Sequence, residues 1–313
     1  MATYKETKGS SVQNFSSDPS NPIAGQVWYN TTSNVLKVSD GPVVSAWATA
    51  NSMNTGRGRL GSAGTNTAAL GFGGYEPVSF HRNLTESWNG TNWTEVNDLN
   101  AARYSLAGCG ATNTAALAFG GYPGPTADTE TWNGTNWTEV NNLNTARSYL
   151  AGAGTNTAAL AFGGYPVLAV TETWNGTNWT EVNDLNTARN DPGGAGTNTA
   201  ALAFGGNPTT AVTELWNGTN WTEVNDLNTA RKYLGGAGTQ TAALAFGGNP
   251  TTAVTETWNG TNWTEVNDLN TARYSLAGAG VTNTAALAFG SYPVTAATEE
   301  WTTSGGTTTI STE

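Results

Sequence analysis

The stretch from Trp174 to Arg189, WNGTNWTEVNDLNTAR, decides the fold because it recurs almost unchanged along the chain. Further copies begin at Trp88, Trp132, Trp216 and Trp258, so successive copies lie 44, 42, 42 and 42 residues apart. A repeat of this length is typical of β-propellers, in which each blade is a small four-stranded sheet. The 313 residues therefore predict one large repeat domain rather than two ordinary domains.

Turn signals divide each repeat into four short strands. In one unit SYLAGAGTNTAALAFGGY supplies a Gly-rich strand A and an apolar strand B, TETWNGT supplies strand C and NWTEVNDL supplies strand D. Leu160 and Phe162 alternate with Ala159 and Ala161 along strand B, which predicts a sheet packed between two neighbours, with small residues on one side. The pair Asn175-Gly176 predicts a type I′ turn between strands C and D.

Several spaced features recur together around the chain: an Arg after strand D, a Gly-Gly pair ending strand B, and aromatic residues in strands C and D. In one unit these are Arg147, Gly163-Gly164, Trp174 and Trp179. On these features the chain resembles the kelch family, and the resemblance implies an all-β, kelch-like propeller. It departs from the family in having Trp where strand C usually has Tyr, and in the Gly290-Ser291 pair of the last unit.

Six A-to-B hairpins predict a six-bladed propeller. Each hairpin is marked by one Phe, namely Phe72, Phe119, Phe162, Phe204, Phe246 and Phe289. The last unit lacks a strand D, whereas Trp47 precedes Arg57 by the same spacing that separates a strand-D Trp from the next repeat Arg. We therefore expect residues 42–49 to form strand D of the last blade, so that an N-terminal strand closes the ring and removes its open edges.

The expected organisation has three parts. Residues 1–41 form an N-terminal attachment segment, 42–304 the propeller and 305–313 a C-terminal tail.

Composition excludes several classes of partner. A net charge of −11 argues against nucleic acid, whose phosphates require clustered Lys and Arg. The N-terminus has no apolar signal region, and no apolar stretch is long enough for a transmembrane helix, so we expect no membrane insertion. Cys109 stands where the other repeats have Ala, which indicates a small core residue.

Two repeat-wide sets of residues invite a functional interpretation, but packing is the better one. Trp on strands C and D could stack against sugars, yet their periodicity indicates packing between blades. The Arg after strand D and the Glu of strand C recur in the same way, which favours ion pairs that fix blade register over a ligand site. These rings are Arg57, Arg103, Arg147, Arg189, Arg231 and Arg273, with Glu86, Glu130, Glu172, Glu214, Glu256 and Glu299.

The chain has no recognisable catalytic constellation. The single histidine, His81, lies in an insertion of the first unit, and one His with one Cys supplies neither a nucleophile-base pair nor a zinc cage. The ligands of kelch-type copper oxidases and the Asp boxes of six-bladed sialidases are absent. We predict no enzyme activity, no metal and no cofactor; calcium and an unrecognised glycan lyase or hydrolase site are the alternatives. The Asp residues of VNDLN are interpreted as turn formers: Asp98, Asp184, Asp226 and Asp268.

Differences between the near-identical repeats gather in two places. The B-to-C segments read YEPVSFHRNL, YPGPTAD, YPVLAV, NPTTAV, NPTTAV and YPVTAA, and the triplets after each repeat Arg read GRL, YSL, SYL, NDP, KYL and YSL. Both connections emerge at the same end of an antiparallel blade, so we expect them to line one face. A Tyr-rich face suits recognition of protein or glycan, and neutral drift of exposed loops is the alternative. The candidate binding residues are Tyr75, His81, Arg82, Tyr104, Tyr122, Tyr149, Tyr165, Asp191, Lys232, Tyr233, Tyr274 and Tyr292.

The segment before the repeats has a character of its own. NPIAGQVWYNTTSNVLKVSDG reads as a β-hairpin and resembles short segments near the ends of tailed-phage virion and tail-fibre proteins. A lone hairpin is marginal in water, so we expect it to dock on a partner or on the propeller. The residues interpreted as an attachment site are Trp28, Tyr29, Leu36 and Val38.

Together these features predict a non-enzymatic structural or adhesive virion protein of a tailed phage: a tail fibre, a baseplate component or a capsid decoration. Its expected partners are another virion protein, bound through the N-terminus, and a host surface glycan or protein. The alternative is a soluble, cytoplasmic kelch-type module for protein–protein interaction.

Overall fold

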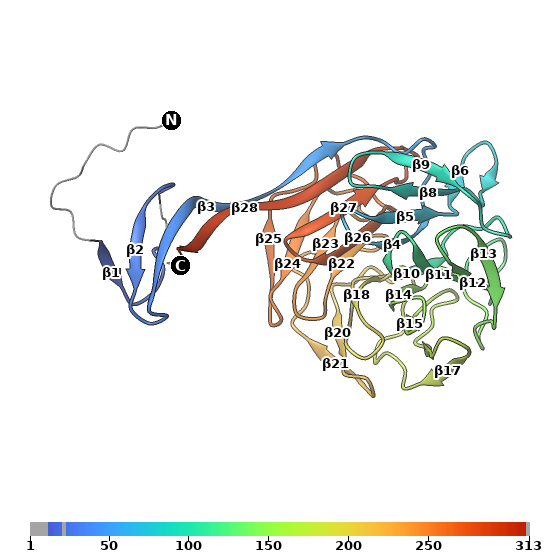
Figure 1. Ribbon diagram of the computed structural model, residues 1–313. Coiled ribbons are helices and arrows are strands. Elements are labelled where there is room, and N and C mark those ends of the chain that lie inside the picture. The colour runs from blue at the N-terminus through green and yellow to red at the C-terminus, as the bar shows by residue number, and fades with distance from the viewer. Residues whose placement is uncertain (1–11, 21–22, 311–313) are drawn as a thin grey trace. The chain divides into compact units, whose positions relative to one another are not determined.

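The computed structural model describes residues 12–20 and 23–310 (Figure 1). Residues 1–11, 21–22 and 311–313, and with them parts of the two predicted end segments, lie outside the described residues. The chain forms two compact units, one from Ala46 to Thr302 and one built from the two chain ends, up to Ser45 and from Thr303. The described residues form strands and turns, and none of them belongs to a helix that could cross a membrane.

The larger unit is built from repeated four-stranded antiparallel sheets whose strands pair in chain order. The first two sheets are β4 (Gly61–Gly64), β5 (Ala69–Phe72), β8 (Thr85–Trp88), β9 (Trp93–Val96), and β10 (Ala107–Thr112), β11 (Ala115–Phe119), β12 (Thr129–Trp132), β13 (Trp137–Val140). The next two are β14 (Ala151–Gly154), β15 (Ala159–Phe162), β16 (Thr171–Trp174), β17 (Trp179–Val182), and β18 (Gly193–Gly196), β19 (Ala201–Phe204), β20 (Thr213–Trp216), β21 (Trp221–Val224). The fifth is β22 (Gly235–Gly238), β23 (Ala243–Phe246), β24 (Thr255–Trp258), β25 (Trp263–Val266). This confirms the predicted repeat of four strands and a propeller-like, all-β fold.

A further sheet joins the two ends of the chain. Its strand order is β1-β2-β3-β28-β27-β26, with β26 at Ala277–Thr282 and β27 at Ala285–Phe289. β3 (Val35–Ala50) and β28 (Thr298–Ile310) each have residues in both units. In the larger unit the ring centroids of Trp47 on β3 and Trp301 on β28 lie 5.5 Å apart. The corresponding distance between Trp174 and Trp179 in an ordinary sheet is 5.4 Å. The N-terminal strand therefore stands where the other sheets have their fourth strand.

The first strands of the sheets lie innermost and follow one another around the middle of this unit (Figure 1). β4 contacts β10, β10 contacts β14, and the sequence continues through β18, β22 and β26 back to β4. Gly-rich sequence permits this approach, since a Cβ added to Gly236 would stand 2.7 Å from the carbonyl oxygen of Gly194 on the neighbouring strand.

Apolar side chains pack between neighbouring sheets. Leu160 and Phe162 join one buried cluster with Trp221 of the following sheet, whereas Ala159 and Ala161 join the cluster on the other side. The rings of Phe162 and Trp221 lie 5.1 Å apart, nearly edge to face. The alternation predicted for strand B is confirmed, and small residues face the larger ones of the neighbour.

The Trp side chains of the larger unit are buried and hydrogen-bonded, as the packing interpretation requires. Each fourth-strand indole Nε1 donates to a third-strand Thr Oγ1 of the preceding sheet, at 3.0 to 3.1 Å. The pairs are Trp47 to Thr255, Trp93 to Thr298, Trp137 to Thr85, Trp179 to Thr129, Trp221 to Thr171 and Trp263 to Thr213.

The two rings of charge form buried ion pairs. Each repeat Arg pairs with the Glu of the next third strand at 2.9 to 3.1 Å, and Arg147 and Glu172 are fully buried. Burial lowers the pKa of Arg147 to about 10, against the opposing effect of Glu172. Glu172 also accepts hydrogen bonds from the backbone N–H and side-chain amide of Asn144, so each pair fastens the connection between two sheets.

The type I′ turn predicted between strands C and D is wrong. Trp174 and Trp179 form the last pair, which leaves a four-residue turn in which Gly176 has a positive φ of 91° and Asn175 does not. The Asn175 Oδ1 instead accepts the backbone N–H groups of Thr177 and Asn178, at 2.9 Å each. By bonding these backbone groups, the Asn side chain stabilises the four-residue turn. The two-residue turn would instead require a positive φ at Asn175.

The described part of the smaller unit centres on a β-hairpin. β2 (Val27–Asn30) pairs antiparallel with β3, opposing Trp28 to Lys37, and β1 (Gln13–Phe15) pairs parallel with β2. Asp18 accepts hydrogen bonds from the indole of Trp28, the amide of Asn30 and the ammonium of Lys37. These bonds, that of Lys37 first, hold the pKa of Asp18 below its usual value.

Candidate binding face

A circle of backbone hydrogen bonds surrounds one opening of the larger unit. Its six members occupy the second position after each repeat Arg, and each N–H donates to the carbonyl of the preceding member, at 2.7 to 3.3 Å. We call this set the mouth ring; it consists, in order, of Arg59, Ser105, Tyr149, Asp191, Tyr233 and Ser275. All six residues have φ between 52° and 57°, a left-handed conformation that is rare for non-glycine residues and marks a constrained site.

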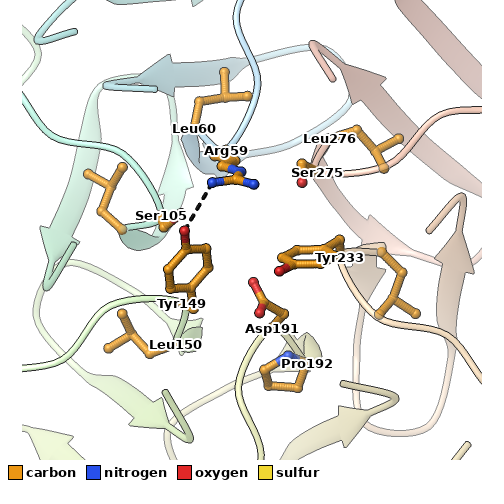
Figure 2. A pocket seen from close by; sticks show the side chains of 12 residues that line it. Arg59, Leu60, Ser105, Tyr149, Leu150, Asp191, Pro192, Tyr233, Ser275 and Leu276 are labelled. Carbon is orange, nitrogen blue, oxygen red and sulfur yellow. Dashed lines mark hydrogen bonds between the residues drawn. The ribbon is translucent and has the colours of Figure 1, made fainter. Parts of the chain in front are cut away.

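Arg59 lies at one side of this opening, with its guanidinium directed toward the middle (Figure 2). Its guanidinium lies 5.6 to 6.0 Å from the ring centroids of five tyrosines, and its Nη1 donates a 3.0 Å hydrogen bond to the hydroxyl of Tyr149. Cation–π contacts of this kind hold the cation between aromatic faces. The tyrosines concerned are Tyr75, Tyr104, Tyr149, Tyr233 and Tyr292.

The eight tyrosines named as candidates form one continuous chain of ring contacts, with centroids 5.2 to 6.4 Å apart. Tilted and edge-on arrangements predominate, as aromatic pairs prefer. In order of contact the chain runs Tyr122, Tyr104, Tyr75, Tyr292, Tyr274, Tyr233, Tyr149 and Tyr165. Tyr122 and Tyr165, at its two ends, are exposed.

Two charged candidates accompany the tyrosines. Burial raises the pKa of Asp191 well above its usual value, and Arg59 and Lys232 oppose this in part. Lys232 lies 5.5 Å from the Tyr233 ring and donates to the side-chain oxygen of Asn207. Burial, and then the nearby Asp191, raises the pKa of Tyr233 to about 12.

The mouth ring encloses a cavity of about 110 Å³. Its lining combines ring residues with apolar neighbours such as Leu150 and Pro192 (Figure 2). Three buried polar atoms in this lining have no hydrogen-bond partner among the described residues: the Nε of Arg59 and the hydroxyls of Ser105 and Ser275. Buried polar groups in proteins are nearly always hydrogen-bonded, so a water molecule or a ligand in the cavity would satisfy these three atoms.

His81 and Arg82 lie apart from the mouth ring, on a hairpin found in the first unit. This hairpin pairs β6 (Tyr75–Glu76) with β7 (Phe80–His81). His81 is exposed, and Arg82 forms an ion pair with Glu76 at 2.5 Å. Phe80, 60% exposed, adds an apolar group next to Tyr75.

Three residues of the mouth ring, Arg59, Ser105 and Ser275, were not among the sequence-derived candidates. They are the middle letters of the triplets GRL, YSL and YSL, which the sequence shows to be variable. The same middle letters of SYL, NDP and KYL are Tyr149, Asp191 and Tyr233. The register of the triplets, rather than residue type alone, was the signal that could have found all six.

The opposite opening has a different lining. A cavity of about 320 Å³ there is lined by Gly, Ala and Thr of the first strands, together with Ser62, Cys109 and Val281, and none of its lining residues is charged. Cys109 is buried, and burial raises the pKa of its thiol, consistent with a core residue. Chemical variety is thus concentrated at the mouth ring.

The four residues interpreted as an attachment site all lie on the paired strands β2 and β3. Trp28 is fully buried, whereas Tyr29, Leu36 and Val38 are half-buried. The exposed large apolar side chains among the described residues of the same unit are Val12, Ile23, Val27, Val43 and Val44.

The Asp residues of VNDLN act as strand caps. Asp184 Oδ1 accepts the backbone N–H of Thr171 at 3.0 Å, and Asn142 does the same for Thr129 in the unit that lacks the Asp. Within residues 12–20 and 23–310, no group of three or more His, Cys, Asp or Glu side chains is arranged to hold a metal ion. No protein-family model matches the sequence, and a search of curated proteins finds no match to it.

Proposed function

We propose that the protein is a six-bladed, kelch-type propeller that serves a tailed-phage virion as a non-enzymatic structural or adhesive protein. Its face around the mouth ring recognises a host surface glycan or protein. The continuous tyrosine chain around Arg59 is the observation that carries this proposal.

The blade count and closure rest on two circles of hydrogen bonds. The mouth ring has six members whose backbone bonds return to the first, and six indole-to-Thr bonds join each sheet to the one before. Trp47 supplies one of these bonds, which supports an N-terminal strand as the fourth strand of the last blade. The repeat Arg, the Gly-Gly pair and the paired aromatics support the kelch type.

Recognition is supported by the chemistry of the face. Tyrosine supplies large, rigid contact area and a hydroxyl at low entropic cost, and it is enriched at binding surfaces. Tyr122 and Tyr165 present exposed aromatic area at the edge of the cluster, while Arg59 and Lys232 add charge. Repeats that are otherwise nearly copies differ here, as expected when one scaffold carries a specific surface.

The smaller unit supports attachment to a larger assembly. Its hairpin carries the sequence that resembles ends of phage virion proteins, and Ile23 is 75% exposed and Val43 63% exposed. Large apolar side chains that are exposed on a small unit are available for contact with another protein.

A binding experiment tests the recognition role. The labelled full chain is applied to an array of bacterial surface glycans and to intact bacterial cells, with Tyr122→Ala and Tyr165→Ala as variants. Both side chains are exposed, so their removal leaves the packing of the sheets in place. Thr177→Ala, in an exposed C-to-D turn, is the matched control.

We expect the wild type and Thr177→Ala to be retained, and the two tyrosine variants to bind at least tenfold more weakly. Equal binding by all variants would show that the face around the mouth ring does not bind the glycan or the cell. No retention of the wild type on either glycans or cells would contradict an adhesive role.

A further inference from the structure

The mouth ring carries opposite charges at opposite positions. Six members follow one another around the opening, and Arg59 and Asp191 stand three places apart in both directions. Figure 2 shows the guanidinium and the carboxylate on opposite sides of the cavity, both directed toward its middle. The site is therefore divided into a cationic half and an anionic half.

Neither Arg59 nor Asp191 belongs to an ion pair among the described residues. The two side chains form no ion pair with each other among the described residues, and the Asp191 carboxylate accepts no hydrogen bond from them. Arg59 donates through Nη1 to Tyr149, and its Nε is buried without an acceptor. Each half retains hydrogen-bonding capacity for a ligand.

The ring neighbours of Arg59 differ in chemistry from the ring neighbours of Asp191. Ser105 and Ser275 stand on either side of Arg59 in the ring; they are 7% and 6% exposed, and their hydroxyls have no partner among the described residues. Tyr149 and Tyr233 stand on either side of Asp191, and their rings, which already lie within 6 Å of the Arg59 guanidinium, line the cavity on this side. Hydroxyl donors beside a guanidinium suit a carboxylate, and aromatic faces beside a carboxylate suit an ammonium.

Packing alone does not require this pattern. Positions that pack sheets together, such as the ion pairs and the indole-to-Thr bonds, carry the same residue types in each repeat. The mouth ring has the same backbone geometry in each repeat but contains four residue types in six places.

We infer that the mouth ring binds a small zwitterion, with its carboxylate on Arg59 and the two serines and its ammonium on Asp191 between the two tyrosines. This inference rests on the recognition role proposed for the same face. The cavity of about 110 Å³ is several times the ~30 Å³ that a water molecule occupies in the liquid, so the ligand, or the part of it that enters, has few heavy atoms.

Calorimetric titration with ω-amino acids tests the inference. The probes run from glycine through β-alanine, 4-aminobutyrate and 5-aminovalerate to 6-aminohexanoate, so that the distance between the two charges increases stepwise. Butyrate and n-butylamine carry one charge each and serve as controls. We expect one chain length to bind best, and to bind at least tenfold more tightly than either single-charge control.

Variants assign the two ends. Asp191→Asn is expected to weaken the best zwitterion at least tenfold while leaving butyrate binding unchanged. Arg59→Gln is expected to weaken both the zwitterion and butyrate. Thr177→Ala lies in the turn between the third and fourth strands and not in the mouth ring, so this variant is expected to bind as the wild type does. Thermal melting verifies that each variant is folded.

The inference is overturned if no ω-amino acid binds more tightly than butyrate, or if Asp191→Asn binds the zwitterion as the wild type does. Its failure is distinguishable from that of the recognition role. If the titrations fail while Tyr122→Ala and Tyr165→Ala still lose array binding, the zwitterion site is wrong and the recognising face stands.

Discussion

The indole Nε1 of Trp47 donates a 3.0 Å hydrogen bond to the hydroxyl of Thr255, a residue 208 positions further along the chain. The same bond joins Trp221 to Thr171 within the continuous repeats. Trp47 also lies 4.9 Å from Phe246, as Trp221 lies 5.1 Å from Phe162. The N-terminal strand thus reproduces the contacts of an ordinary fourth strand.

Thr255→Val should destabilise the protein, because the buried indole N–H of Trp47 would lose its acceptor. The expected loss is about 1–3 kcal/mol of unfolding free energy, the cost of leaving a buried donor unsatisfied. Thr264→Val, on the exposed face of β25, is the matched control and should change little. Urea unfolding measures both, and equal midpoints for the two variants would show that the Trp47 contact does not hold the ends together.

Arg147→Met should be among the most damaging single substitutions, because it leaves Glu172 buried without its cation. Breaking a buried pair costs about 3–5 kcal/mol. Arg82→Met removes a half-exposed pair with Glu76 and should cost about 0–1 kcal/mol. If chemical denaturation gives similar losses for both, the buried pairs are not what fastens one sheet to the next.

Asp184→Asn should be tolerated, whereas Asp184→Ala should lose about 0.5–1.5 kcal/mol, the value of one hydrogen bond. The reason is that Asn142 already performs the capping role of this position in another repeat. Thermal melting of the wild type and both variants is measured in calcium-free buffer and again after calcium is added. A calcium-dependent rise in the melting temperature of the wild type that Asp184→Asn lacks would favour a metal site instead.

Asp191→Asn should stabilise the protein increasingly as pH rises from 3.5 to 7. Burial raises the pKa of this carboxyl, so the folded state binds the proton more tightly than the unfolded state, and wild-type stability is lost as pH rises through the raised pKa. Arg59 and Lys232 face the group and reduce the effect without reversing it. Melting temperatures of the two proteins should agree at pH 3.5 and diverge in favour of the variant at pH 7; divergence in the other direction would mean that the carboxylate is well paired.

Much of the fold is predictable because the same pattern of strands and turns occurs in each repeat of the sequence. The alternation of Leu160 and Phe162 with alanines predicts which side of the sheet faces which neighbour, and the structure agrees. The turn at Asn175 was predicted wrongly, because a dipeptide rule ignores the hydrogen bonds that the Asn side chain makes to Thr177 and Asn178.

The sequence predicted only three of the six residues of the mouth ring. Tyrosines such as Tyr149 and Tyr233 are recognisable by type, but Arg59 and Ser275 become neighbours only when the ring of backbone bonds brings the first and last repeats together. Variable triplets mark the region, and the structure shows that the middle and last residues of each triplet line the cavity, the middle ones supplying its polar and aromatic groups.

Cryo-electron microscopy of purified phage particles, with a search for this chain on them, tests the proposed virion role most directly. We predict density for the larger unit on the particle, with the smaller unit in contact with a neighbouring virion protein and the mouth ring and its tyrosines open to solvent. Particles without this density, with the chain recovered as a free monomer, would contradict the virion role and favour a soluble interaction module.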